Sequence, residues 1–280
     1  MAGQAKQVLD LKRQAVDQAL DRLLTVDGGD LAAAMRYAVL GPGKRFRPLL
    51  LLSAGESQGE ETEKLMPFAC AVELIHSYSL IHDDLPCMDN DDYRRGELAC
   101  HKRFGEMTAV LAGDALLALA FEIMIGADSG KGGPAGKDKG IKEIADSAGP
   151  AGLVGGQWLD LTLSSEQMSE DQYLETAGKK TAALIKASVM AGALVAGAPT
   201  GRLEVLAGFG YSVGLAFQLR DDIIDSAGSA SARGAGAVIV LGAEKAAARL
   251  TSEIERAVQL LQPAGIDSEE LEYLARSLIN

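Results

Sequence analysis

Two stretches decide how this chain folds: Asp83-Asp84-Leu85-Pro86-Cys87-Met88-Asp89 and Asp221-Asp222-Ile223-Ile224-Asp225. An apolar segment with helical spacing leads directly into each stretch, so each is predicted to lie on a helix that faces the interior. Three carboxylates on an inward face repel one another and are costly to desolvate. A folded protein holds such a set twice only with a cation between them. Aspartate ligands favour the hard, oxygen-binding ion Mg2+.

Helical periodicity continues through most of the remaining chain, and no segment shows the convincing alternation of a strand. The pattern predicts an all-α bundle that forms a single domain over residues 1–280. Two segments, 126–140 and 226–236, are predicted to be loops because small and polar residues replace the apolar repeat. The expected helices cover residues 8–24, 31–40, 48–57, 63–82, 108–125, 141–161, 171–196, 202–225, 243–261 and 268–279.

Composition narrows the classes of partner and compartment. The net charge of −12 argues against nucleic acid as a partner. Three cysteines without a CxxC motif predict reduced thiols and a cytoplasmic protein. The first seven residues lack the apolar run of a signal peptide. The longest apolar stretch, 109–125, contains Asp114 and Glu122 and is short for a membrane span, so we expect a buried core helix there.

Spacing within the two acidic stretches predicts how their carboxylates converge. Asp221 and Asp225 are four residues apart and share one helix face. Asp83 and Asp89 are six apart and do not, but Pro86 between them should kink or end the helix and allow them to meet. The alternative interpretation is a solvated acidic helix end. The apolar runs that lead into both stretches weaken it.

Cations occur in three places where a polyanionic ligand would need them. The turn at 41–48 carries Lys44, Arg45 and Arg47, the pair Arg94-Arg95 follows the first acidic stretch, and Lys180-Thr181 opens another helical segment. Each alone is more typical of a solvated surface patch. Together with two metal-type clusters they indicate a diphosphate held between Mg2+ and basic side chains.

Histidine supplies one further candidate and one competing interpretation. His76 lies seven residues, or two helical turns, before Asp83 and so points roughly the same way, as a neutral donor to phosphate or as an ordinary core histidine. The doublet His82-Asp83 is typical of metal phosphohydrolases with further distant histidines. No histidine follows His101, so such a metal site is hard to complete.

These motifs together resemble the trans-prenyltransferase (polyprenyl diphosphate synthase) family, in particular its bacterial farnesyl and geranylgeranyl diphosphate synthases. The similarity extends over nearly the whole chain in the expected order. Its first acidic motif with its flanks is highly specific. The matching segments are 43–48, 75–92, 94–96, 111–116, 155–157, 180–181 and 217–225.

The resemblance implies an all-α isoprenoid synthase type I fold around a deep central cavity, usually as a homodimer. It implies head-to-tail condensation of isopentenyl diphosphate with an allylic diphosphate, without a membrane span. The implied isopentenyl diphosphate ligands are Lys44, Arg47, His76 and Arg95. The implied Mg2+ ligands are Asp83, Asp84, Asp89, Asp221 and Asp225, with Asp222 as a further catalytic residue. Arg94, Lys180, Thr181 and Gln218 would lie at the allylic diphosphate, Lys180 and Thr181 with catalytic roles.

Product length should follow from the depth of that cavity. Tyr78 and Ser79 lie about one helical turn before Asp83, and Tyr78 would project into the tunnel as a floor. In the bacterial branch of the family, an aromatic residue there implies the C15 product, farnesyl diphosphate, rather than the C20 product. The alternative is that Tyr78 is ordinary core.

The chain departs from the family after Asp225. The family continues with a loop that carries two lysines, whereas residues 226–242 contain no lysine and only Arg233 as a cation. This keeps open a weakly active or regulatory prenyltransferase subunit. A class I terpene cyclase is disfavoured, because its second motif mixes Asn, Ser or Thr with Glu and it would leave Lys44 and Arg47 without a role.

Overall fold

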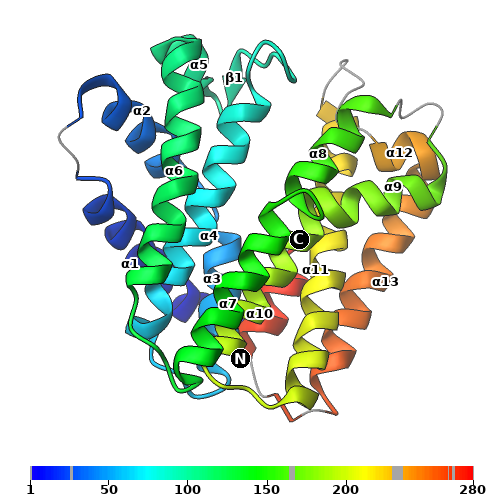
Figure 1. Cartoon of the computed structure of the whole chain (residues 1–280). Helices are drawn as coiled ribbons and strands as arrows, with labels where there is room; N and C mark the ends of the chain where they lie inside the picture. The colour runs from blue at the N-terminus through cyan, green and yellow to red at the C-terminus, as the bar shows by residue number, and fades with distance from the viewer. Residues whose placement is uncertain are drawn as a thin grey trace.

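The computed structural model describes residues 2–25, 28–163, 168–228, 236–263, 265–266 and 269–279. These residues form an all-α arrangement, as predicted, with one hairpin of two strands that are each two residues long (Figure 1). The elements are α1 (Ala2–Leu23), α2 (Gly29–Leu40), α3 (Phe46–Glu56), α4 (Thr62–Asp83), β1 (Tyr93–Arg94), β2 (Glu97–Leu98), α5 (Cys100–Phe104), α6 (Glu106–Gly126), α7 (Gly133–Ala148), α8 (Leu153–Thr162), α9 (Glu170–Ala177), the π-helical turn η1 (Gly178–Ala182), α10 (Ala183–Val195), α11 (Thr200–Gly228), α12 (Gly236–Leu241), α13 (Ala243–Leu261) and α14 (Glu269–Arg276).

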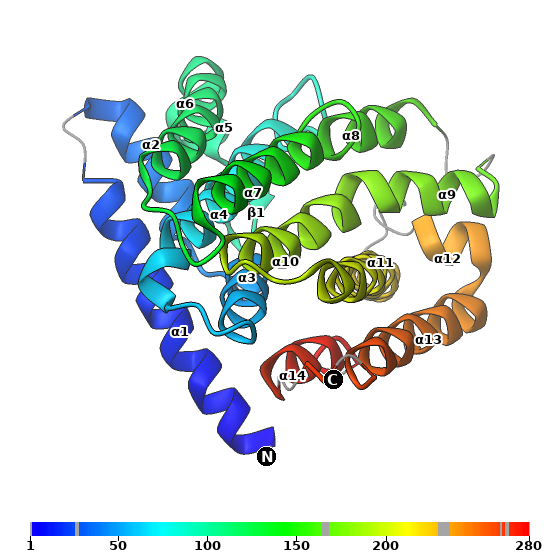
Figure 2. The same ribbon diagram turned by 60° about the horizontal axis from the view of Figure 1, so that its bottom comes forward.

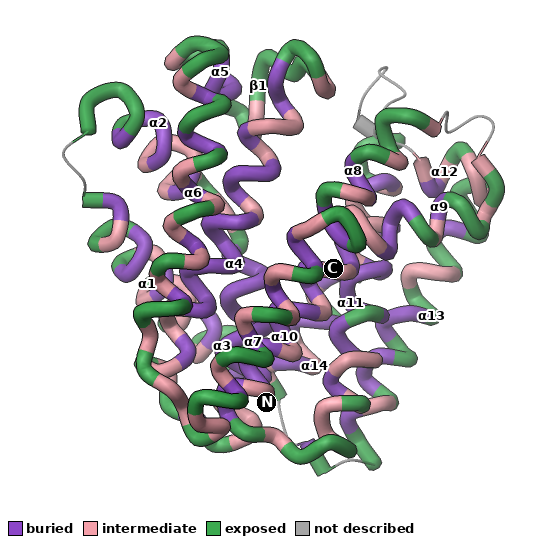
Figure 3. The backbone as a smooth tube through the Cα atoms, viewed as in Figure 1, coloured by how far each residue is buried: buried purple, intermediate pink, exposed green. Residues whose placement is uncertain are grey.

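The helices that carry the two acidic stretches run in the same direction. Both α4 and α11 ascend in Figure 1, so their C-terminal ends lie at the same end of the bundle. The helix α4 is apolar on all sides, with Phe68, Leu74 and Ile75 fully buried. Such a helix belongs in the centre of a core, and Figure 3 shows it buried along most of its length. The fold therefore fixes Asp83 at the end of a largely buried helix.

Small residues bring α10 into backbone contact with its neighbours. Figure 2 shows α10 lying between α7 and α11 and against α3, and it contacts all three. A Cβ atom built on Gly192 would lie 2.2 Å from the carbonyl oxygen of Leu51, and one on Gly136 would lie 2.4 Å from that of Leu194. Larger side chains at these positions would force the helices apart.

Four predicted segments differ from the structure, two expected loops and two expected helices. The segment 126–140 is not wholly a loop, because α7 begins at Gly133 with Pro134 in its first turn, and its glycines serve packing against α10. The expected helix 141–161 is broken between α7 and α8 around Pro150. The expected helix 171–196 is interrupted by the π-helical turn η1. Of the predicted loop 226–236, residues 229–235 with Arg233 lie outside the described residues, and 226–228 extend α11.

The segment expected to be a buried core helix, within α6, is buried on one face only. Ala112, Leu116 and Met124 are fully buried, whereas Met107 is 75% exposed and Ile125 64% exposed. Among the described helices, α6 alone is long and apolar enough to cross a membrane by those two criteria. It packs against α2, α4 and α5 within the bundle, and Asp114 and Glu122 lie on its exposed side.

Candidate active site

The first acidic stretch folds back on itself after α4 ends. The backbone N–H of Asp89 donates to the carbonyl oxygen of Asp83 over 2.9 Å, which returns Asp89 to the helix end as the position of Pro86 predicted. Burial raises the pKa of Asp83 to about 7, and the nearby charge of Asp89 contributes in the same direction. The pKa of Asp89 is also raised by burial. Asp83 and Asp89 therefore form a partly buried carboxylate pair.

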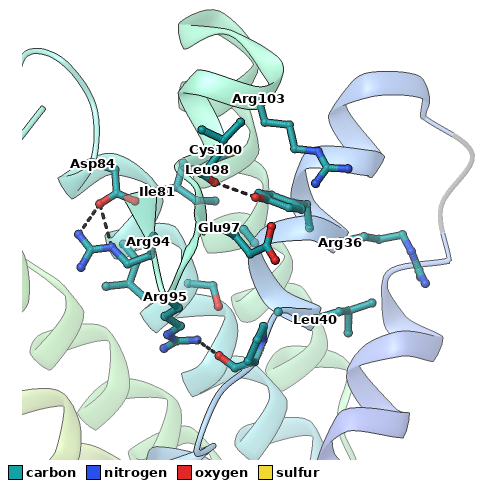
Figure 4. Close-up of a pocket in the computed structure, with 16 residues that line it drawn as sticks. Arg36, Leu40, Ile81, Asp84, Arg94, Arg95, Glu97, Leu98, Cys100 and Arg103 are labelled. Carbon is teal, nitrogen blue, oxygen red and sulfur yellow. Dashed lines mark hydrogen bonds and ion pairs between the residues drawn. The ribbon is translucent and has the colours of Figure 1, made fainter. Parts of the chain in front are cut away.

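Asp84 lies apart from this pair. Its carboxylate accepts a hydrogen bond of 2.9 Å from Nε of Arg94 and a second from Nη2 of the same side chain. It lines a separate cavity of about 370 Å3 between α2, α4 and the hairpin, where Figure 4 shows it facing Arg94. The structure thus places Asp84 in an ion pair with Arg94.

The second acidic stretch divides in the same way. Asp221 and Asp225 share a face of α11 and form the second carboxylate pair. Burial raises the pKa of both, and the charge of Arg94 lowers that of Asp225, so Arg94 lies near both stretches.

Asp222 instead anchors three elements by hydrogen bonds. It accepts from the Tyr173 hydroxyl at 2.9 Å, from Nε2 of Gln218 at 2.7 Å and from the backbone N–H of Ala237 at 2.8 Å. These bonds join α9, α11 and α12. Burial raises the pKa of Asp222 to about 6, while the three hydrogen bonds act in the opposite direction. Asp222 therefore holds α12 against α9 and α11.

Lys180 supplies a cation to the carboxylates from the π-helical turn. Its Nζ lies 2.6 Å from a carboxylate oxygen of Asp160. Burial opposes its charge, but Asp160, Asp83 and Asp89 together raise its pKa. A Cβ atom on Gly156 would lie 2.1 Å from the backbone nitrogen of Lys180, so α8 approaches the turn closely. The neighbouring Thr181 donates to Gln218, which places both predicted residues in the hydrogen-bond chain to Asp222.

Lys44, Arg47, His76 and Arg95 line a second cavity of about 440 Å3, which we call the basic cradle. Arg47 is buried, lies 5.6 Å from the centre of the Phe217 ring, and has no partner for its Nε among the described residues. Burial lowers its pKa to about 10. A buried guanidinium with an unused N–H indicates an anion-binding site.

His76 is held neutral within this cradle. Burial lowers its pKa well below the usual range, and the charges of the surrounding arginines lower it further. Its Nε2 lies 3.5 Å from Nη2 of Arg95. Asp221 lines the same cavity, so the basic cradle adjoins the second carboxylate pair.

Sequence reasoning missed four residues of this arrangement. Arg45 was noted only as a cation of its turn. Glu73 lies three residues before the predicted His76, and Asp160 lies three residues after Gln157 of a segment that matches the family, so helical spacing was an available signal. Nothing in the sequence marks Tyr173 as a partner of Asp222.

The carboxylates of this site could hold a hard cation only if further ligands completed its coordination. Within the described ranges, no three His, Cys, Asp or Glu side chains lie close enough to hold a metal ion. Each carboxylate pair supplies hard oxygen ligands. Burial raises the pKa values of Asp83 and Asp221, so a cation beside them would stabilise their ionised forms. An ion would therefore draw its remaining ligands from water or from a bound oxyanion, as Mg2+ usually does.

Comparison with known proteins decides the family. The family model for polyprenyl synthetases matches residues 29–256. The chain belongs to this family. A farnesyl diphosphate synthase of Geobacillus stearothermophilus is 40% identical to this polyprenyl synthetase, covering 96% of the chain and 95% of the relative. The farnesyl diphosphate synthase of Escherichia coli K12 is also 40% identical, over 98% of the chain and 97% of the relative.

Solved structures agree with the assignment. An FPP/GFPP synthase from Zymomonas mobilis superposes on this polyprenyl synthetase with a TM-score of 0.88 at 35% identity, and each chain covers the other completely. A geranyltransferase from Legionella pneumophila gives a TM-score of 0.87 at 32% identity, over 99% of this chain and 97% of the neighbour. The fold is the all-α isoprenoid synthase type, and the protein is a prenyltransferase. The terpene cyclase and phosphohydrolase interpretations are therefore wrong.

The raised pKa of Asp83 predicts a pH-dependent cost in the metal-free protein. An exposed aspartate ionises near 3.8 and folded Asp83 near 7, so stability should fall as pH rises through this window. Asp83→Asn should therefore stabilise the metal-free protein at pH 8, by at most about 4 kcal/mol, and should have little effect near pH 4. Urea unfolding in EDTA between pH 4 and 8 measures this difference.

Asp92→Asn provides the matched control. Asp92 lies in the same loop, and its hydrogen bond with Lys102 lowers its pKa. Its substitution should give no stabilisation that grows with pH. If the stability difference between Asp83→Asn and the wild type did not change with pH, Asp83 would ionise in the folded protein without a cost in stability.

Proposed function

We propose that this polyprenyl synthetase condenses isopentenyl diphosphate head to tail with an allylic diphosphate, in a Mg2+-dependent reaction that gives farnesyl diphosphate. The observation that carries the proposal is that the basic cradle and the second carboxylate pair meet at Asp221 in one cavity. A diphosphate in the cradle would thus lie directly beside one bound through the carboxylates. Two adjacent sites of opposite charge suit two diphosphate substrates.

The two sites differ in how they would bind their diphosphates. In the cradle, Lys44, Arg47 and Arg95 supply charge and His76 a neutral donor, so isopentenyl diphosphate requires no metal there. Asp83 and Asp89, with Asp221 and Asp225, would hold Mg2+ and through it the allylic diphosphate. Lys180 and Arg94 lie near these pairs and can meet the same diphosphate. Asp84 accepts two hydrogen bonds from Arg94, and Asp222 accepts three from Tyr173, Gln218 and Ala237, so we assign these two carboxylates to positioning rather than metal binding.

The residues present account for the chemistry of such a condensation. Mg2+, when bound, takes up the charge that develops on the departing diphosphate. Lys180 and Arg94 add hydrogen bonds to that leaving group. The allylic cation needs apolar surroundings so that water does not capture it. The alkene of isopentenyl diphosphate then attacks and a proton leaves, which requires no protein nucleophile.

Tyr78 supports the C15 product. It is buried about one turn before Asp83, and its ring meets that of His82 edge to face at 5.7 Å. Ser79 donates to the carbonyl oxygen of His76 over 2.9 Å, so its small side chain folds against its own helix. Relatives of the chain include synthases named for both products. Product length therefore rests on Tyr78 as the floor of the tunnel.

Replacing Tyr78 with alanine should lengthen the product by at least one five-carbon unit, because it removes the ring that closes the tunnel. Chromatography of radiolabelled products by chain length measures this. Ser79→Ala is the control and should leave the length unchanged, since it removes only a hydroxyl bonded to the helix backbone. If Tyr78→Ala gave a product of unaltered length, Tyr78 would be an ordinary core residue and not the floor of the tunnel.

The short segment after Asp225 is the main argument for a weakly active or regulatory subunit. Residues 226–242 contain no lysine. Against that alternative, the carboxylate pairs, Lys180 and the basic cradle are all in place among the described residues. A purely structural subunit would have no use for a buried Arg47 with an unpaired N–H. We therefore propose an active enzyme.

Labelled isopentenyl diphosphate with dimethylallyl or geranyl diphosphate should give a prenyl product in the presence of Mg2+ and none in EDTA. Asp83→Ala and Asp221→Ala should each lower turnover by about a hundredfold or more while circular dichroism remains unchanged. Asp92→Asn should keep activity. No elongation from either primer would favour the regulatory subunit, and near wild-type turnover in either alanine variant would refute the metal assignment.

We also propose that two copies of the chain associate through α6 and α8. Figure 2 shows α6, α7 and α8 along one edge of the molecule. Their exposed apolar residues are Met107, Val110, Leu111 and Ile125 on α6 and Val154, Trp158 and Leu161 on α8. An apolar surface of this kind marks an interaction site. Asp114 and Glu122 on the same side of α6 would be costly in lipid, which favours a protein partner over a membrane.

The wild-type protein should sediment as a dimer, and Leu111→Glu should shift it toward monomer by placing a charge in the apolar contact. Leu11→Glu is the matched control, because Leu11 is 65% exposed on α1, away from this surface. Sedimentation equilibrium distinguishes the two. A monomeric wild type, or a Leu111→Glu variant of unchanged mass, would contradict the proposal.

We place the enzyme in the cytoplasm. Cys70, Cys87 and Cys100 are all free thiols, and Cys87 is exposed. An exposed free thiol is typical of a reducing compartment.

A further inference from the structure

Arg45 is a cation of the basic cradle whose bonds are already used within the protein. Its side chain is 3% exposed, and its guanidinium meets three acceptors, two on helices and one in the turn after α2. Nε donates to Asp17 of α1 at 2.7 Å, Nη1 to Glu73 of α4 at 2.9 Å, and Nη2 to the carbonyl oxygen of Gly41 at 3.1 Å. A planar guanidinium can satisfy such a fixed set of acceptors, whereas an ammonium group cannot.

The backbone at Arg45 has an unusual conformation. Its φ is +50°, in the left-handed region that a residue with a Cβ seldom adopts. Such strain persists only where the surroundings determine it. It occurs at the start of α3, between Lys44 and Arg47, so it sets the direction in which both cations leave the turn.

Gly43 shows how tightly this turn packs. A Cβ atom there would lie 2.8 Å from Nη1 of Arg45 and 3.1 Å from Nη1 of Arg95. Arg95 in turn donates to the carbonyl oxygen of Pro42 over 3.0 Å. The turn is therefore held from one side by Arg45 and from the other by a predicted substrate ligand.

Glu73 is the acidic member of the arrangement. Its side chain is 3% exposed, and it lies one helical turn before His76 on α4. It faces the charges of Arg45, Arg47 and Arg95, whose pKa values it raises against the effect of burial. With Glu73 and Asp221, the residues that line the cavity carry a net charge of +2 from four cations and two carboxylates, with His76 neutral.

We propose that Arg45 and Glu73 form a positioning pair for the basic cradle. The pair holds the turn that carries Lys44 and Arg47 against His76 and Arg95, and neither member binds the substrate. The inference rests on the proposed function for the identity of the ligand as isopentenyl diphosphate. The positioning role applies to any diphosphate that the cradle binds.

Glu73 could affect diphosphate binding through its charge alone or by positioning the turn, and the two explanations predict opposite results for Glu73→Gln. Removing a negative charge from a cationic cavity should tighten diphosphate binding if charge alone matters. If Glu73 positions the turn, the same substitution replaces the charged acceptor of Arg45 by a weaker neutral one, and binding weakens despite the greater positive charge. Arg45→Lys keeps the charge and loses the three-way contact, so charge alone predicts no change there.

The test is calorimetric titration of inorganic diphosphate in EDTA, where only the cradle can bind it without metal. Glu73→Gln and Arg45→Lys should each weaken binding at least tenfold. In steady-state assays, KM for isopentenyl diphosphate should rise at least tenfold while KM for the allylic diphosphate changes less than threefold. Glu253→Gln is the matched control and should leave both KM values unchanged. Glu253 is likewise 3% exposed and paired with arginine, but it lies on α13.

Each outcome either supports or overturns the positioning role of Arg45 and Glu73. Equal or tighter binding by folded Glu73→Gln, unchanged binding by Arg45→Lys, or equal rises in both KM values would overturn the inference. If Glu73→Gln does not fold, Arg45→Lys carries the test alone. A wild type that binds diphosphate in EDTA but makes no prenyl product would refute the proposed function and leave the positioning result intact. A wild type that binds none would refute the positioning role itself.

Discussion

Repulsion between partly buried carboxylates at the ends of α4 and α11 is the constraint on which the rest of the structure depends. Burial raises the pKa of Asp83, Asp89, Asp221 and Asp225, so each pair gains from a nearby positive charge. The protein supplies part of it through Lys180 and Arg94. The apolar centre of the bundle must hold these helix ends in place at a cost in stability.

The cations of the site serve two different purposes. Some, such as Arg45, are bound to protein carboxylates and acceptors and shape the site. Others, such as Arg47, are buried with unused hydrogen-bonding capacity. This division explains how a chain of net charge −12 can bind a polyanion: the positive charge is concentrated in one cavity and placed in a fixed geometry.

Much of this could be predicted from the sequence, because apolar periodicity reports burial directly. The all-α class, the end of α4 near Pro86 and the shared face of Asp221 and Asp225 are all local properties. The break before α8 was missed although Gly149, Pro150 and Gly152 mark it locally. The π-helical turn at Lys180 was missed because it depends on packing between helices distant in sequence. The same limit applies to Asp84 and Asp222. The sequence of each motif does not distinguish these two aspartates from their neighbours, whereas tertiary partners such as Arg94 and Tyr173 do.

The glycine contacts of α10 have a mechanical consequence. Where Gly192 meets α3 and Gly136 of α7 meets α10, backbone touches backbone, so these helices cannot slide past one another without steric overlap. The π-helical turn that carries Lys180 lies at the other end of α10, beyond these contacts. Gly156 of α8 meets the backbone of Lys180 in the same way, so the glycine contacts restrict sliding at both ends of α10.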